Sequence, residues 1–262
     1  MRWSKGELPT PEERQWILDT FHWCLRHGGG VVELAHSPLV LPDDDFFPVD
    51  LDQPADARAQ QLLHLVAEHA GLGDIDFQLH VIDDAVWAEQ GPPQMELIDD
   101  VMPIPVPASV IDVEDDADLL ALVDVFVLEV AFFLTGSFST EPPSRVAIPY
   151  AQKELGEDAA AEIAAVFMGF GVFILDTCVA RMPKGKLTDD PGLSDVGACF
   201  ALALFMVLQE LPYAFAREFM PKAARATVKK CITALESTFA ADVERLKVAG
   251  LPGGAPDEGP VG

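Results

Sequence analysis

The residues best placed to do chemistry are two glutamates in the apolar second half of this 262-residue chain, Glu129 and Glu162. A zinc-peptidase helix carries two histidines four residues apart, and the glutamate directly after the first histidine activates the metal-bound water. Glu129 stands at that glutamate position, but the two ligand positions hold Leu128 and Phe132. Neither side chain has a lone pair to donate, and a catalytic zinc needs three protein ligands. The pattern therefore predicts a site without its metal.

Both glutamates also have ordinary structural explanations. An unpaired buried charge is costly, so Glu129 would need a cationic partner inside an apolar helix. The candidate partners are Arg145, Lys153 and Arg181. Glu162 lies near the start of its helix, where the helix dipole favours acidic residues. Glycine is unfavourable within a helix, and a close helix crossing would explain Gly169 and Gly171.

Further segments accompany these residues in a defined order. Pro38-Leu-Val-Leu-Pro42 and Phe46-Phe47-Pro48 precede the Glu129 helix, and Glu162 precedes Gly169-Phe170-Gly171. With its segments in this order, the chain resembles, over residues 16–235, an uncharacterised bacterial family that is similar to small gluzincin-type zinc metallopeptidases. In that family a His-Glu-x-x-His helix lies between such segments, and an acidic residue follows as a further ligand.

The resemblance implies a zincin-like scaffold with Glu162 at the third-ligand position. It also implies that Leu128, Glu129, Phe132 and Glu162 are vestigial positions, with no catalytic residue, no cofactor and no metal. If Glu162 faces the Glu129 helix, the changes Leu128→His and Phe132→His should create a zinc site. The alternative is a metal-dependent hydrolase whose ligands come from histidines folded over Glu129 and Glu162. All six histidines lie in the first 80 residues, and the candidates are His36, His64, His69 and His80.

The charge distribution indicates the class of partner. The formal net charge is −26, and residues 33–118 contain 21 Asp and Glu against one base, Arg58. Nucleic-acid binding needs a basic surface, and an anionic membrane would repel this chain as well. An acidic field of this size attracts cationic partners. We therefore expect a non-catalytic inhibitor, immunity or adaptor protein that recognises a basic protein surface. Adaptation for solubility is a further interpretation.

Hydrophobic periodicity predicts an α+β fold that is predominantly α. The acidic N-terminal portion, residues 1–117, should contain a short sheet and two helices. The helices should cover residues 11–27, capped by Thr10 in a capping box with Glu13, and residues 56–69. The predicted strands cover residues 77–82, 95–98 and 106–113. Residues 118–248 should form a bundle packed with this portion as one domain, with helices over 119–134, 159–180, 194–211 and 221–248. Residues 249–262 read as a disordered tail.

The apolar helices are expected to be buried rather than inserted in a membrane. A membrane span needs about 20 mostly apolar residues, and the uninterrupted apolar stretches here have 13 residues or fewer. The N-terminus lacks the apolar stretch of a signal peptide. The four cysteines are widely spaced and none forms a Cys-x-x-Cys pair. We therefore expect a cytoplasmic protein with reduced, buried thiols.

Overall fold

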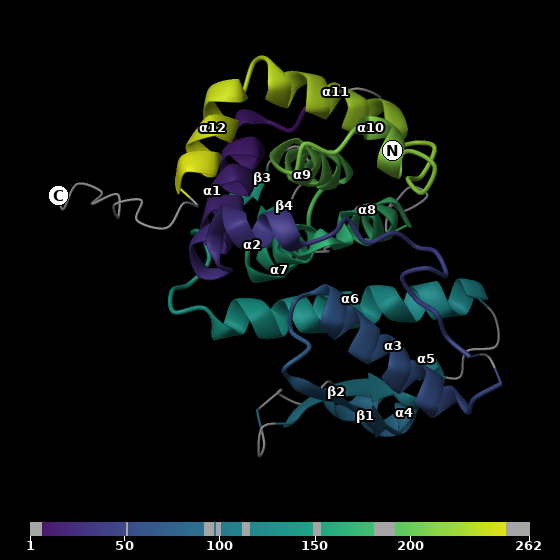
Figure 1. Ribbon diagram of the computed structural model, residues 1–262. Coiled ribbons are helices and arrows are strands. Elements are labelled where there is room, and N and C mark those ends of the chain that lie inside the picture. Colours follow the sequence, from purple (N-terminus) through teal and green to yellow (C-terminus); the bar gives the residue numbers. More distant parts are fainter. Residues whose placement is uncertain are drawn as a thin grey trace.

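The computed structural model describes residues 7–50, 52–91, 97, 101–111, 116–148, 153–180 and 192–249. It has the expected class, α+β and predominantly α. A long apolar helix, α6 (Asp116–Ser137), crosses the middle of the molecule and separates two groups of elements (Figure 1). The part below α6 in that view is acidic and is called the acidic lobe. It consists of α3 (Ala55–His69), β1 (Asp76–Ile82), α4 (Asp84–Gln90), β2 (Val101–Pro107) and α5 (Ala108–Ile111).

The group on the other side of α6 is almost entirely helical. Its helices are α1 (Pro11–His27), α2 (Gly30–His36), α7 (Glu157–Ala165), α8 (Gly171–Ala180), α9 (Asp195–Leu208), α10 (Tyr213–Ala216), α11 (Arg225–Glu236) and α12 (Ala240–Ala249). The short strands β3 (Val146–Ile148) and β4 (Lys153–Leu155) pair antiparallel. Helix α1 packs against α7, α9 and α12. Residues 7–36 thus lie with the C-terminal helices and not with the acidic lobe that follows them in sequence.

Helix α1 begins and ends where the sequence predicts. Thr10 is its N-cap, and the Thr10 hydroxyl accepts a hydrogen bond from Glu13 N at 3.2 Å. Pro11 occupies the first helical position, where its missing N–H has no cost. Gly28 N then donates to Cys24 O at 2.7 Å and closes the last turn. The buried face of α1, with Trp16, Ile17 and Phe21 at helical spacing, joins the core.

The acidic lobe is built on a two-stranded parallel sheet. Strands β1 and β2 pair from Asp76 opposite Val101 to Ile82 opposite Pro107. Prolines occupy alternate positions 103, 105 and 107 of β2. Proline has no N–H, so the donors that β2 contributes to the ladder come from the residues between the prolines. The prolines therefore line the outer edge of β2, which cannot donate to a further strand.

Three sequence-based boundaries are wrong. Of the strand expected over 106–113, only residues 106 and 107 belong to a strand, β2, and residues 108–111 form helix α5. The helix expected over 159–180 is interrupted by a π-helical turn, Val166–Phe170, because Gly169 has φ +99°. The helix expected over 221–248 is two helices, α11 and α12. The strand expected over 95–98 lies outside the described residues except Leu97, and the predicted disordered tail lies outside them except Ala249, where α12 ends.

The core is continuous from α1 to α12 and includes residues of the acidic lobe. Two segments, Leu119–Ser137 and Glu157–Ala180, are long and apolar enough to cross a membrane by length and composition alone. The second is 78% buried within the protein, as core helices are, and the first is 33% buried. The absence of membrane insertion therefore stays a prediction. All four cysteines are free and buried, one more than the three for which the sequence predicts burial.

Candidate functional site

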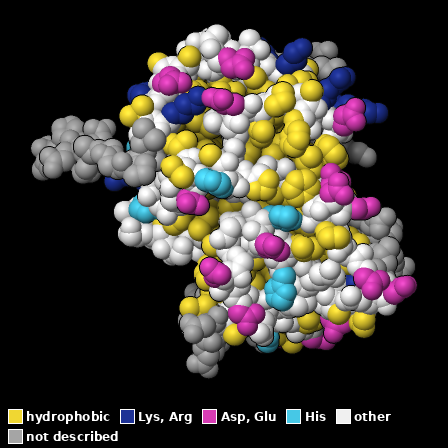
Figure 2. Space-filling model, in the orientation of Figure 1, with side chains coloured by type: hydrophobic (Ala, Val, Ile, Leu, Met, Phe, Trp, Pro, Cys, Tyr) yellow, Lys and Arg dark blue, Asp and Glu magenta, His cyan; other side chains and the backbone are white. Residues whose placement is uncertain are grey.

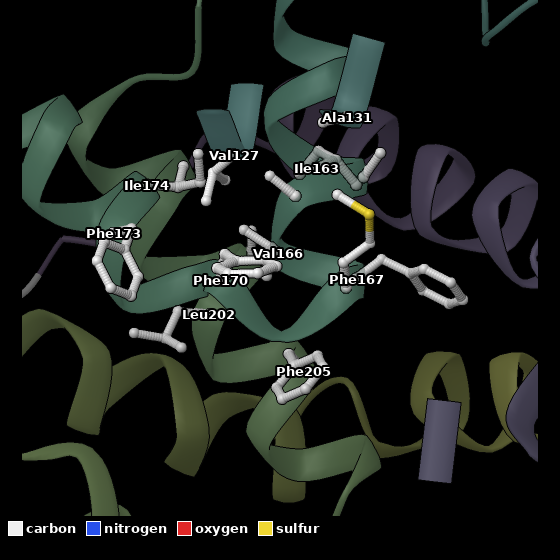
Figure 3. Close-up of a cluster of buried hydrophobic side chains, with 14 of the residues drawn as sticks. Val127, Ala131, Ile163, Val166, Phe167, Phe170, Phe173, Ile174, Leu202 and Phe205 are labelled. Carbon is white, nitrogen blue, oxygen red and sulfur yellow. The ribbon is translucent and has the colours of Figure 1, made fainter. Parts of the chain in front are cut away.

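The two helices that carry the candidate glutamates pack directly against each other. Figure 3 shows Val127 and Ala131 of α6 turned toward the side chains of α7 and α8, with Ile163 and Ile174 among them. These four side chains are almost completely buried. The expected ligand positions Leu128 and Phe132 are only partly buried and lie at the margin of this core. The surface of α6 that meets α7 is therefore filled by aliphatic side chains.

Glu129 faces away from α7. It follows Val127 by two residues, which places its side chain about 200° further around the helix. Among the described residues, no hydrogen bond or ion pair to the Glu129 carboxylate is present. Burial in apolar surroundings raises the pKa of this carboxyl above its usual value. The carboxylate is therefore half-buried and without a counter-charge in the part of the chain that is described.

The expected cationic partners of Glu129 lie elsewhere or outside the described residues. Arg145 Nη2 is 3.7 Å from Glu157 Oε1, and both side chains are exposed. The side chain of Lys153 and the whole of Arg181 lie outside the described part of the chain. Desolvation of Glu129 is thus opposed by none of the described cations.

Glu162 is buried and points to the start of α9. Its Oε2 accepts a hydrogen bond from Leu193 N at 2.5 Å. Glu13 of α1 reaches the same segment, where its Oε1 accepts from the Ser194 hydroxyl at 2.5 Å. Ser194 in turn caps α9, since its Oγ accepts from Gly197 N at 2.8 Å. Two buried carboxylates therefore meet at one helix N-terminus, where backbone N–H groups and the helix dipole favour negative charge.

Glu129 and Glu162 do not converge on one point. By helix geometry Glu129 lies on the side of α6 that faces away from α7, whereas Glu162 is bonded to the residue before the N-cap of α9. Sequence reasoning missed the part that Glu13 plays, because its partner Ser194 is 181 positions away. The only local signal was a carboxylate on the buried face of an N-terminal helix. The geometry does not support a metal ion shared between the two glutamates.

The proline-bounded segment, residues 38–42, contacts the Gly-Phe-Gly segment, residues 169–171, which the sequence did not predict. Val40 N donates to Gly169 O at 3.0 Å. A Cβ at residue 169 would lie 2.0 Å from Pro38 O, so this approach of two backbones requires glycine. A Cβ at Gly171 would lie 2.8 Å from Leu202 Cδ1, which is the close helix crossing expected there. The contacts account for both glycines without a ligand.

The histidines that could have supplied metal ligands are engaged separately. His36 Nδ1 lies 2.7 Å from Val32 O, and His69 Nε2 lies 2.9 Å from Phe46 O. His64 contacts Gln60 and Phe77 O on the acidic lobe, and His80 is exposed on β1. In the described part of the chain, no three His, Cys, Asp or Glu side chains form a group that could hold a metal ion.

The acidic lobe carries its charge on its surface. Its exposed acids include Asp56, Glu68, Asp74, Asp76, Asp83, Asp84 and Glu89. Arg58 is the one basic residue in the sequence between residues 33 and 118. In the face shown in Figure 2, most Lys and Arg lie over the upper part of the molecule, interspersed with Asp and Glu, whereas the titratable side chains of the lower part, where the acidic lobe lies, are mainly Asp, Glu and His. The molecule is thus electrostatically polarised. Comparison with known protein families, curated proteins and solved structures finds no match for this chain.

Proposed function

We propose that this chain is a non-catalytic protein that binds another protein, and that its acidic lobe recognises a basic surface on that partner. An inhibitor, an immunity protein and an adaptor all fit this description. The observation that carries the proposal is the concentration of exposed carboxylates on α3, α4 and the loops around them, with Arg58 as the single base. Such a surface accelerates encounter with cationic partners and disfavours others.

The arrangement of the vestigial positions supports a binding role over catalysis. Aliphatic side chains fill the contact between α6 and α7, and Glu162 is engaged by Leu193. We propose that the scaffold derives from that of a zinc peptidase whose metal site was lost. Support comes from the packing of α6 on α7 and from the hydrogen bond between Val40 and Gly169, which joins two segments of the resemblance. A scaffold that no longer binds a metal ion need not keep the side chains of Glu129 and Glu162 directed at one point.

The test is retention of a partner by the immobilised protein at low and high salt. Exposed ion pairs weaken when salt screens them, so the partner should be retained at low salt and released at high salt. A variant with Glu68→Gln, Asp74→Asn and Glu89→Gln removes three exposed acids from the acidic lobe and should lose the partner. The matched control removes the same charge elsewhere, through the exposed residues Glu7, Glu141 and Glu218 changed to Gln.

Two results would contradict this proposal. One is equal retention of the same partner at both salt concentrations. The other is equal loss in the acidic-lobe variant and in the matched control, because net charge rather than the lobe would then decide binding. Both variants change only exposed side chains, so their unfolding midpoints should match the parent within experimental error.

A further inference from the structure

A cavity of about 400 Å³ lies at the far end of the molecule from the acidic lobe, where the end of α9 meets α11 and α12. Its floor is apolar, and Met206, Leu235 and Val243 are almost completely buried there. Cavities that bind small molecules usually measure about 300–1,000 Å³ and are lined mainly by apolar side chains. This cavity therefore has the size and floor of a small-molecule site.

The rim of the cavity is charged, and its charge is unbalanced. Glu210, Glu236 and Glu244 line it together with one base, Lys247. Lys247 Nζ lies 3.6 Å from Glu210 Oε1 and 3.7 Å from Glu244 Oε1. One ammonium group is thus shared between two of the three carboxylates. The rim keeps an excess of negative charge over an apolar floor.

Local structure disfavours acids at two of these positions. Helix α11 ends at Glu236, and Glu210 follows directly on the last turn of α9. The carbonyl end of a helix carries partial negative charge, so acids there are repelled. Glu210 also has φ +55°, in the left-handed region where glycine is usual after a helix. Positions where a sequence departs from several local preferences at once are expected at functional sites.

We propose that this cavity binds a small organic cation with an apolar body. The ammonium group of the ligand lies among the carboxylates of Glu210, Glu236 and Glu244, and its hydrocarbon part covers Met206 and Val243. Charge complementarity selects a cation over a neutral or anionic ligand of the same shape. Lys247 competes with the ligand for two of the carboxylates. The inference is independent of the proposed function, because it concerns the opposite end of the molecule.

The experiment uses the full chain and three probes with the same phenylalkyl body: phenylbutylamine, phenylbutanol and phenylbutyrate. Isothermal titration calorimetry at low salt should show saturable binding of the amine. The amine should bind at least tenfold more tightly than the alcohol, and the carboxylate should not bind. Ala240→Trp places a large side chain at the cavity wall and should abolish binding of the amine.

Three rim variants separate a binding role from a structural one. Glu236→Gln should weaken binding of the amine at least threefold, while Glu218→Gln, an exposed acid outside the cavity, should leave it unchanged. Lys247→Met removes the competing ammonium group and should tighten binding at least threefold. Glu210→Gly should weaken binding of the amine because it removes a rim carboxylate. The same change should raise the unfolding midpoint, because glycine adopts the left-handed backbone conformation of residue 210 without strain.

The proposal is overturned if the amine shows no saturable binding up to millimolar concentration. It is also overturned if the three probes bind equally, or if amine binding survives Ala240→Trp in a variant whose circular dichroism spectrum matches the parent. Weaker binding of the amine by Lys247→Met would also reject the proposal, because Lys247 would then support binding of the amine instead of competing with it.

Discussion

The side-chain amide of Gln60 pairs with the backbone of Phe77 and Leu79 as a neighbouring strand would. Gln60 Oε1 accepts from Leu79 N, and Gln60 Nε2 donates to Phe77 O, both at 2.8 Å. Helix α3 thereby provides partners for two backbone groups on the edge of β1 that faces away from β2. Prolines line the opposite edge of the sheet, on β2. A two-stranded sheet is marginal by itself, and here one edge is covered by an amide and the other lacks donors.

Replacing this amide should destabilise the acidic lobe. Gln60→Leu leaves Leu79 N–H without its partner in a partly buried place, whereas Phe77 O keeps His64 Nε2 at 3.2 Å. We therefore expect a loss of about 1–3 kcal/mol in the free energy of unfolding. Urea denaturation followed by circular dichroism measures it. The control is Gln15→Leu on α1. The Gln15 amide donates to the Asp19 carboxylate, and both side chains are exposed. Equal effects of the two changes would mean that the strand-like pairing of Gln60 contributes nothing.

Gly169→Ala should be strongly destabilising. Its φ of +99° is unfavourable for any side chain, and its Cβ would lie 2.0 Å from Pro38 O. We expect a loss of at least about 2–3 kcal/mol in the free energy of unfolding. Gly136→Ala is the matched control, because a Cβ at that exposed helical position meets nothing within 4 Å. That change should stabilise the chain by about 0.5–1 kcal/mol. A loss below about 1 kcal/mol at Gly169 would show that the backbone there can relax.

Glu129 should make the stability of the chain depend on pH. Burial raises its pKa in the folded state above the usual 4.5. The folded state therefore holds its proton to higher pH than the unfolded chain does, and stability falls as pH rises from about 4.5 through the raised folded pKa. Each unit of increase in the folded pKa corresponds to about 1.4 kcal/mol.

Glu129→Gln removes this dependence on pH. The variant should be more stable than the parent at neutral pH, and the difference should vanish below about pH 4.5. Thermal unfolding across the pH range measures this, with the exposed Glu68→Gln as the control. A difference that grows as pH falls would mean that Glu129 is stabilised in its charged form.

The paired change Leu128→His and Phe132→His should not create a zinc site. Val127 and Ala131, rather than residues 128 and 132, face α7, and Glu162 is bonded to Leu193. Zinc affinity measured against a competing chelator should therefore equal that of the parent, in a variant first shown to fold. The opposite result would be stoichiometric zinc that is lost on adding Glu162→Gln. Metal analysis of the parent tests the alternative of a histidine-based hydrolase in the same preparation.

The sequence was sufficient where structure depends on neighbours along the chain. Thr10 and Pro11 begin α1, and the apolar period of residues 119–134 identifies α6, because capping and periodicity are local. It was insufficient where distant segments decide. The left-handed Gly169 depends on Pro38, and the direction of Glu162 depends on Leu193, 31 positions away. Periodicity places a residue on a helix, but packing decides which neighbour that side of the helix meets. The sequence was therefore sufficient to identify Glu129 and Glu162 as candidate positions. It was not sufficient to show that their side chains point to different parts of the molecule.

Glu210→Gly should stabilise the chain although it removes an ion pair. Glu210 N donates to Val207 O and Leu211 N donates to Met206 O, which is the helix ending that normally places glycine at the left-handed position. Glycine removes a backbone cost of about 1–2 kcal/mol, and the exposed pair with Lys247 contributes at most about 1 kcal/mol. We expect a net gain of about 1 kcal/mol in urea denaturation. Glu210→Ala is the control, because it removes the same carboxylate and keeps the left-handed side chain. Equal stability of the two variants would show that the carboxylate, and not the backbone, sets the stability at this turn.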